Sequence, residues 1–321
     1  MNSSDTTCVK IARRTLETAD IVSLELRAPD GAPLPAFEAG AHIDVHVGTG
    51  IVRQYSLCNP PSECDRYVIG VLRDPASRGG SSAIHEGFAE GAIVEISRPR
   101  NHFPLVSGVR SILIAGGIGV TPLLCMAEAL QAAGSDFVMH YCARSKDRTA
   151  FLNRILQAPF ASRVEFHFDN GEPSQKLDLD AVFAQAGDSD EIYVCGPAGF
   201  IDWVCATAER AGIAKHRVRF EYFNAKPVDT SHDGAFDVRI ASTGQVFHVQ
   251  ADRSITSVLG EAGIDIYTSC GEGTCGTCLT RILEGEPEHR DVFLTDDEHA
   301  AGEMFTPCCS RAKSALLVLD L

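Results

Sequence analysis

Short apolar runs with polar residues between them fill the first third of the chain, and Gly and Pro separate the runs. A period of two is typical of strands that bury one face. We therefore expect an antiparallel β-barrel domain over residues 1–105, with strands at Ile21–Leu26, His42–Val47, Tyr67–Leu72 and Ala92–Ile96.

The pattern changes over residues 106–225. Apolar strand runs here alternate with helix-like segments, which predicts a parallel sheet with helices on both faces. The expected strands cover residues 111–115, 137–141, 163–168 and 191–195. The expected helices cover residues 122–133, 150–157, 179–185 and 197–211.

A polar segment with a proline, residues 226–234, has the composition of a linker. Residues 235–321 then form a compact third unit. A hairpin is expected from strands at 236–240 and 245–249, followed by a helix over 254–262 and a cysteine-rich loop. The fold class is therefore multidomain, with all-β and α/β parts.

The formal net charge of −15 argues against a nucleic-acid binder, which needs a basic surface. From Ser231 onward there are fifteen Asp and Glu against six Lys and Arg. This acidic region is either a solvated surface or a means of steering a basic partner. The N-terminus lacks an apolar signal core, and the longest uncharged stretch, 111–127, is interrupted by Gly and Pro. We expect a cytoplasmic protein with no membrane segment.

Five of the twelve cysteines lie in the last 52 residues. Cys270, Cys275 and Cys278 have the C-x4-C-x2-C spacing of a plant-type 2Fe–2S cluster. Glycines between them allow the backbone to wrap closely and to direct N–H groups at sulfur. Zinc is the rival metal, although paired C-x2-C knuckles would suit it better. Spacing alone leaves the fourth ligand open between Cys308 and Cys309.

R-x-Y-S at residues 53–56 and R-G-G-S at residues 78–81 both lie in the barrel region. These two segments resemble the flavin site of the ferredoxin–NADP reductase superfamily. R-x-Y-S at residues 53–56 is similar to its flavin-binding strand, where Tyr stacks on the flavin, Ser contacts the N5 side and Arg pairs with phosphate. R-G-G-S at residues 78–81 is similar to its second phosphate site, before a short helix. The resemblance implies flavin contacts from Arg53, Gln54, Tyr55, Ser56, Arg78, Gly79, Gly80 and Ser81.

The nucleotide site is expected where an apolar strand ends in G-G-I-G-V-T-P, residues 116–122. This is not the G-x-G-x-x-G fingerprint, but it resembles the G-G-x-G-x-T-P segment of the same superfamily. C-G-P at residues 195–197 resembles the motif that places a Cys beside the nicotinamide. The implied contacts are Gly116, Gly117, Gly119, Thr121, Cys195, Gly196 and Pro197.

Two residues at expected strand ends bear on the choice of nucleotide. Asp169 would favour ribose hydroxyls and repel a 2′-phosphate, so NADH is preferred over NADPH. Arg144 could instead stabilise a phosphate, which leaves NADPH open.

The order of the three parts, with the ferredoxin-like unit last, is similar to the phthalate dioxygenase reductase family, whose members use FMN. The resemblance covers essentially the whole chain and implies a β-grasp fold for the C-terminal 2Fe–2S domain. Its gap of 29 residues before the last ligand selects Cys308. It also places Phe223 against the flavin, so that Ser56, Cys195 and Phe223 form the implied catalytic set.

The implied function is an NADH-dependent oxidoreductase that passes electrons through FMN and the 2Fe–2S cluster to a Rieske-type aromatic-ring oxygenase. Phthalate dioxygenase is the expected partner; the alternative is a vanillate O-demethylase or another Rieske monooxygenase. Two other classes of protein make different predictions. A carrier ferredoxin fused to inactive domains would fail to oxidise NADH with ferricyanide, and a self-contained flavin monooxygenase would need a substrate pocket that no motif suggests.

Overall fold

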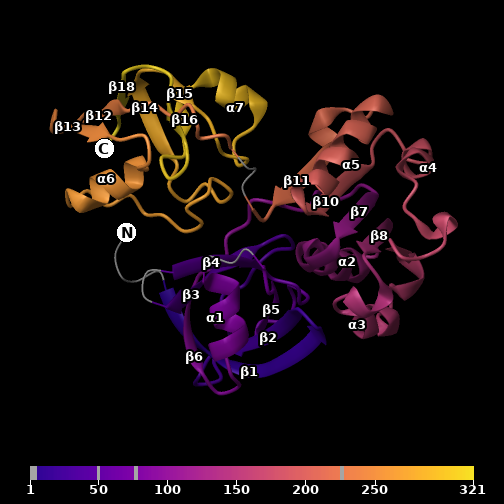
Figure 1. Ribbon diagram of the computed structural model, residues 1–321. Helices are drawn as coiled ribbons and strands as arrows, with labels where there is room; N and C mark the ends of the chain where they lie inside the picture. The colour runs from indigo at the N-terminus through magenta and orange to yellow at the C-terminus, as the bar shows by residue number, and fades with distance from the viewer. Residues whose placement is uncertain (1–5, 49–50, 76–78, 225–227) are drawn as a thin grey trace. The chain divides into compact units, whose positions relative to one another are not determined.

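The computed structural model describes residues 6–48, 51–75, 79–224 and 228–321 (Figure 1). Its internal contacts divide the chain into two units, Met1–Phe223 and Asn224–Leu321. The finer domain boundaries given above, at 105/106, 225/226 and 234/235, stay predictions.

The N-terminal part of the first unit is the expected antiparallel sheet. Six strands pair in the order β4-β3-β6-β1-β2-β5. Their bounds are β1 Thr6–Thr18, β2 Ile21–Arg27, β3 His42–Gly48, β4 Ile51–Ser56, β5 Tyr67–Leu72 and β6 Ile93–Ser97. A bridge between Leu57, just after β4, and Ile69 of β5 joins the two edges, which closes the sheet into a barrel. The short helix α1, Gly80–Gly87, follows β5.

The rest of the first unit is a parallel sheet in the order β11-β10-β7-β8-β9. Its strands are β7 Ser111–Gly116, β8 Phe137–Ala143, β9 Val164–Phe168, β10 Glu191–Gly196 and β11 Val218–Tyr222. The inner strands β7 and β10 are buried along their whole length, as strands covered on both faces must be. Figure 1 shows α2 (Val120–Ala132) and α3 (Leu152–Gln157) on one side, and α4 (Leu179–Ala184) and α5 (Ala198–Arg210) on the other.

The two sheets of the first unit pack together through small residues. A Cβ on Gly70 of β5 would lie 2.8 Å from Cγ2 of Thr121, in the first turn of α2. At the other end, the Tyr193 hydroxyl accepts a hydrogen bond of 2.7 Å from the Val106 amide. One apolar core runs through both sheets, so the residues at their junction are held in fixed register.

The second unit is a mixed sheet in the order β13-β12-β18-β14-β16, with a separate β15–β17 pair. The bounds are β12 Phe236–Ile240, β13 Val246–Val249, β14 Thr280–Glu284, β15 Pro287–Glu288, β16 Met304–Phe305, β17 Arg311–Ala312 and β18 Leu316–Leu319. Helix α6, Ile255–Glu261, begins where the Ser254 hydroxyl accepts the Ser257 amide. Helix α7, Asp296–Ala301, begins with a capping box formed by Thr295 and Glu298.

In the α/β part and in the ferredoxin-like part, the expected strand and helix boundaries agree with the observed ones to within about two residues. Differences of this size are usual between methods of assigning element ends. The structure confirms the predicted fold class. In the part of the chain that the structure describes, none of the helices has the length and apolarity needed to span a bilayer.

Candidate functional site

The cysteine loop of the second unit gathers four sulfurs. The thiol of Cys270 contacts those of Cys275 and Cys308, and Cys278 also contacts Cys308. The loop lies between α6 and β14, and Cys308 reaches it from the segment after β16. Backbone amides of Glu272 and Thr277 donate to the sulfurs of Cys270 and Cys275 at 3.3 and 3.4 Å. Such donors stabilise negative charge on sulfur.

Glycine is required at two places in this loop. Gly273 and Gly276 have φ of 75° and 64°, a region that favours glycine. A Cβ on Gly276 would also overlap the Phe293 ring, and one on Gly273 would meet the backbone of Asp291. The segment Asp291–Leu294 thus packs directly against the cysteine loop. Its conformation is fixed by the Leu294 amide, which donates to the Asp291 carboxylate at 2.8 Å. The sequence alone does not predict this packing.

The adjacent thiols Cys308 and Cys309 point to different neighbours. Cys308 is buried and contacts Cys270 and Cys278. Cys309 contacts Cys308 and the hydroxyl of Thr306, at 3.3 Å, and its sulfur lies against Gly273 of the loop. Of the two thiols, Cys308 is the one that contacts Cys270 and Cys278 directly.

The donor set fits a 2Fe–2S cluster. Four thiols converge, two amides point at sulfur, and glycines with positive φ let the loop turn tightly between them. Plant-type clusters need this combination of Cys ligands and hydrogen-bond donors.

The predicted flavin strand is β4, at one edge of the barrel. Its Arg53, Gln54 and Tyr55 are half-buried, and Ser56 is buried. Burial raises the pKa of the Tyr55 hydroxyl, which stays protonated. Gln54 donates from Nε2 to the buried Asp44 carboxylate at 3.1 Å, so its side chain is held in place.

The second predicted phosphate segment lies against this strand. A Cβ on Gly80 would lie 2.6 Å from Nε of Arg53, and Gly79 has φ of 88°. Gly80 begins α1, and the Ser81 hydroxyl accepts the Asp74 amide at 3.1 Å. The structure thus brings Arg53, Gly79, Gly80 and Ser81 together at a helix N-terminus, a favourable place for phosphate. Arg78 lies outside the described residues.

A carboxylate that the sequence reading missed joins the flavin strand to the parallel sheet. Ser56 donates from Oγ to Oε2 of Glu221 at 3.4 Å, and Glu221 pairs across β10–β11 with Cys195. Ser56, Cys195 and Glu221 therefore meet where the barrel meets the parallel sheet. The sequence signal is the F-E-Y-F run at 220–223, in which Glu221 stands two residues before the predicted flavin contact Phe223.

Burial dominates the electrostatics of this junction. It raises the pKa of Glu221 to about 8, against a smaller lowering by the Ser56 hydrogen bond. Burial, with the nearby Glu221, raises the pKa of Cys195 well above its usual value. At neutral pH the Glu221 carboxyl is mostly protonated, and Cys195 is held as the thiol, the less nucleophilic form. Neighbouring Phe223 packs on the apolar core.

The glycines of the predicted nucleotide loop serve two purposes. A Cβ on Gly119, or on Gly196, would collide with backbone of the facing strand or loop, and one on Gly116 would meet the Phe200 ring at 2.8 Å. These glycines let η1, Gly117–Gly119, lie directly on the end of β10. Gly117 is different: its φ is 56° and the space around it is open.

The remaining predicted contacts differ in exposure. Arg144 and Asp169 follow β8 and β9 and are exposed at the carboxyl edge of the sheet, where ligands of such sheets bind. Pro197 is the N-cap of α5. Thr121 is buried, and its hydroxyl donates to the Ile118 carbonyl at 3.1 Å. These ligand roles stay predictions.

Residues 238–313 match the family model described as a 2Fe-2S iron-sulfur cluster binding domain. This match supports the cluster over zinc. The chain is 55% identical over 314 residues to a vanillate O-demethylase oxidoreductase of a Pseudomonas species, covering 98% of this chain and 99% of that one. It is 43% identical over 316 residues to the phthalate dioxygenase reductase of Burkholderia cepacia, covering 98% and 97%.

A solved phthalate dioxygenase reductase, described as a modular structure for electron transfer from pyridine nucleotides to [2Fe-2S], matches with a TM-score of 0.77. Identity is 42%, and 98% of each chain is covered. Similarity of this extent shows that the fold of all three parts is shared. It also supports the cofactors expected from the sequence, which are FMN, a 2Fe–2S cluster and NADH. The chain belongs to the family of flavin- and 2Fe–2S-containing oxygenase reductases that includes phthalate dioxygenase reductase and the vanillate O-demethylase reductases.

Proposed function

We propose that this protein is the reductase component of a vanillate O-demethylase, transferring electrons from NADH to a Rieske-type oxygenase. The observation that carries the choice of partner is the identity of 55% to a vanillate O-demethylase oxidoreductase, against 43% to phthalate dioxygenase reductase. The expectation that phthalate dioxygenase is the partner is therefore replaced by its alternative.

A flavin links the two ends of this path because it accepts a hydride from a dihydronicotinamide and can release electrons singly, as a 2Fe–2S cluster requires. The protein's own groups supply binding and orientation. Arg53, with the N-terminus of α1, would hold the flavin phosphate, and Tyr55 would offer its ring to the flavin. The close contact of Gly80 with Arg53 supports this assignment.

Glu221 and Ser56 would hold a proton at this junction. With the pKa of Glu221 at about 8, its carboxyl is mostly protonated at neutral pH and hydrogen-bonded to the Ser56 hydroxyl. Cys195 would place a compact, uncharged side chain at the predicted nicotinamide position, which excludes water without adding charge. Asp169 would contact the ribose hydroxyls and disfavour NADPH.

In the second unit, Cys270, Cys275, Cys278 and Cys308 would hold the cluster. Gly271 is exposed and has open space around it, so this side of the loop is accessible to a partner protein.

The choice of partner is tested by reconstitution. The purified reductase is titrated into a vanillate O-demethylase oxygenase and, separately, into the oxygenase of phthalate dioxygenase, with NADH and O2. Demethylation is measured as the release of formaldehyde, and dihydroxylation is measured as the loss of phthalate. We expect at least a tenfold higher kcat/KM for reductase with the vanillate oxygenase, a difference of about 1.4 kcal/mol.

Equal support of both oxygenases, or a preference for phthalate dioxygenase, would refute the vanillate assignment. Reduction of ferricyanide by NADH is the control. It must proceed in every preparation, because it needs the reductase alone and reports whether NADH reduces the flavin.

A further inference from the structure

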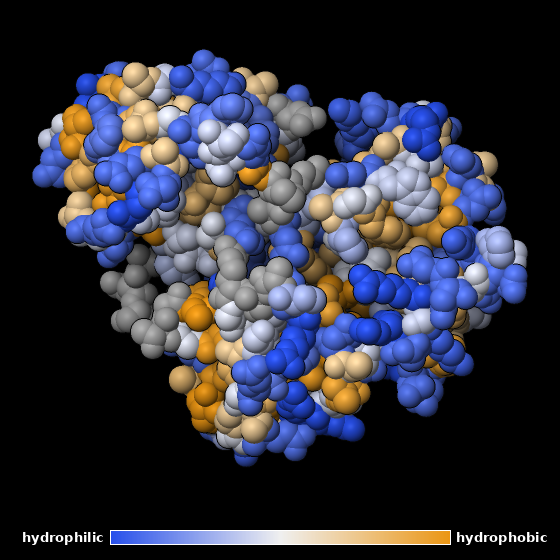
Figure 2. Space-filling model, in the orientation of Figure 1, coloured by the Kyte–Doolittle hydropathy of each residue, from blue (hydrophilic) through white to orange (hydrophobic). Residues whose placement is uncertain are grey.

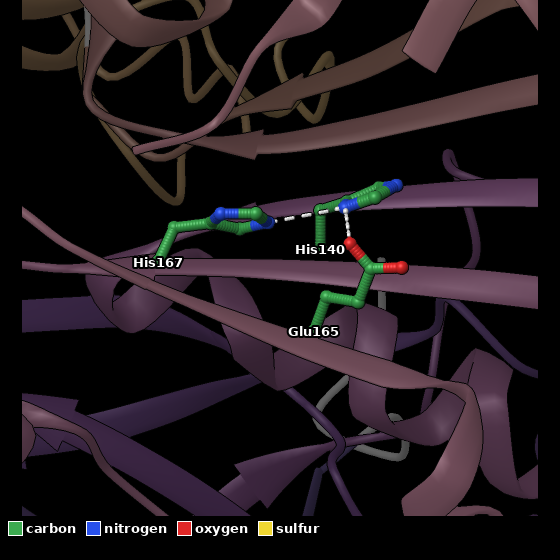
Figure 3. A group of neighbouring side chains, drawn as sticks. All are labelled: His140, Glu165 and His167. Atoms are coloured by element: carbon green, nitrogen blue, oxygen red, sulfur yellow. Dashed lines mark hydrogen bonds and ion pairs between the residues drawn. The ribbon is translucent and has the colours of Figure 1, made fainter. Parts of the chain in front are cut away.

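Two histidines and a glutamate, none of them assigned a role above, meet at the edge of the parallel sheet (Figure 3). His140 is on β8, and Glu165 and His167 are on the edge strand β9. His140 pairs with Glu165 in the β8–β9 register, and His167 follows two residues later, so all three side chains project from one face. Figure 3 shows His167 and Glu165 both directed at the His140 ring.

The ligand atoms are close enough to share one ion. Nδ1 of His140 lies 3.1 Å from Nε2 of His167 and 3.5 Å from Oε2 of Glu165. Two nitrogens on a tetrahedral zinc ion are about 3.3 Å apart, given bonds of about 2.0–2.1 Å. The described residues thus hold the three atoms near the spacing that a bound ion would impose.

A backbone carbonyl fixes the tautomer of His167. Its Nδ1 lies 3.0 Å from the carbonyl oxygen of Gln175, in η4 (Pro173–Gln175). A carbonyl only accepts, so Nδ1 carries the hydrogen and Nε2 presents a lone pair. Metal-bound histidines are held in this way by a carbonyl or carboxylate on the far nitrogen. His140 can then ligate through Nδ1 once its proton moves to Nε2.

The charges and burial suit a cation. The His140 ring is buried, which disfavours its protonated form and suits the neutral imidazole that binds a metal. The Glu165 side chain is 63% exposed, which leaves a path from solvent. Arg110, the cation that acts on His140, is paired with Asp190 at 2.7 Å and with Asp136 at 3.3 Å. Two imidazoles and one carboxylate favour a transition-metal ion over Mg²⁺ or Ca²⁺, which prefer oxygen ligands.

We propose that His140, Glu165 and His167 form a Zn²⁺ site with one position open to water. The ion joins the edge strand β9 to its neighbour β8 and to the turn that carries Gln175. Since β9 leads directly to Asp169, the ion also steadies the strand end at the predicted nucleotide site. This proposal does not depend on which oxygenase the protein serves.

The test is equilibrium dialysis of the untagged holoprotein against buffered Zn²⁺ at about 1 µM free ion, with zinc and iron counted by mass spectrometry. His167→Ala removes a ligand. His216→Ala removes an exposed histidine of η5, Lys215–Arg217, and is the matched control. We expect one bound zinc in the wild type and in His216→Ala, and binding at least about 10-fold weaker in His167→Ala.

Flavin and iron content are measured on the same samples, so that loss of zinc is separated from loss of folding. If His167→Ala does not retain its cofactors, Glu165→Gln, at an exposed side chain, takes its place with the same expectation. Absence of zinc from the wild type, retention of it by the ligand variant, or its loss from His216→Ala would each overturn the proposal.

Discussion

Two neighbouring thiols, Cys308 and Cys309, have different surroundings and allow a residue-scale test. Cys308 contacts Cys270 and Cys278, whereas Cys309 lies beside Thr306. We predict that Cys308→Ser loses the visible absorption of the cluster and its iron, because one of four thiolate ligands is removed. Cys309→Ser is the matched control and keeps both. The reverse result would assign the ligand to Cys309.

Glu221 predicts a pH dependence of stability. Its pKa is about 8 in the folded protein and ordinarily 4.5. Below 4.5 both folded and unfolded chains are protonated. Between 4.5 and 8 the unfolded chain loses the proton first, so stability falls as pH rises. Glu221→Gln cannot ionise and does not share this loss.

The measurement is the thermal midpoint of the holoproteins from pH 5 to 9. We expect the wild type to fall relative to Glu221→Gln by about 2–4 °C for each kcal/mol lost. Parallel curves for the two proteins would show that the Glu221 carboxyl titrates normally.

Asp169 decides the expected nucleotide preference. Its carboxylate is exposed at the end of β9, where it would repel a 2′-phosphate. We predict that Asp169→Ala raises kcat/KM for NADPH relative to NADH by about tenfold, measured with ferricyanide as acceptor. Asp188→Ala, at another exposed acid of this unit, controls for net charge and leaves the ratio unchanged.

At the scale of elements, the contact between η1 and β10 depends on glycine. A Cβ on Gly119 would collide with the backbone of Cys195 and Gly196, which cannot move as a flexible side chain can. We predict that Gly119→Ala lowers the thermal midpoint, with a loss of about 1–3 kcal/mol, and slows NADH oxidation. Gly199→Ala in α5, where nothing lies within 4 Å, is neutral or stabilising. Equal midpoints for the two variants would contradict this packing.

The elements themselves could be predicted because their patterns are local. The apolar run 111–115 reports the burial of its own strand on both faces. The alternation in residues 42–47 predicts the strand but only part of its burial, because His42 and Asp44 on the polar face are buried too. Glu221 could not be predicted in the same way. Its burial arises from the meeting of β4, β10 and β11, which are far apart in sequence. The packing of Asp291–Leu294 against the cysteine loop could not be predicted either, because it too joins segments that are separated in sequence.

The glycine-rich loop at residues 116–119 has a motif that the sequence shows and packing demands that it does not. The G-G-x-G segment predicts space for a pyrophosphate, but Gly116 and Gly119 are required because a side chain there would overlap neighbouring atoms of the protein. Of the three glycines in this segment, Gly117 is the one that combines a positive φ with open space. Sequence alone cannot separate these two demands, because each excludes a side chain.

At the scale of the whole molecule, electrons are proposed to follow one path, from NADH to the flavin and then to the 2Fe–2S cluster. The first unit contains the predicted flavin and nicotinamide contacts, and the second contains the four thiols of the cluster. Each unit has its own core, so each can hold its group independently.

Anaerobic addition of NADH to the holoprotein tests this path most directly. Full reduction places two electrons on the flavin and one on the cluster, so at least about 1.5 equivalents of NADH are added. We predict that the flavin and cluster absorption are then both bleached in the wild type, and that only the flavin absorption is bleached in Cys308→Ser. A wild-type protein whose flavin is bleached while its cluster stays oxidised, or that NADH does not reduce at all, would contradict the account.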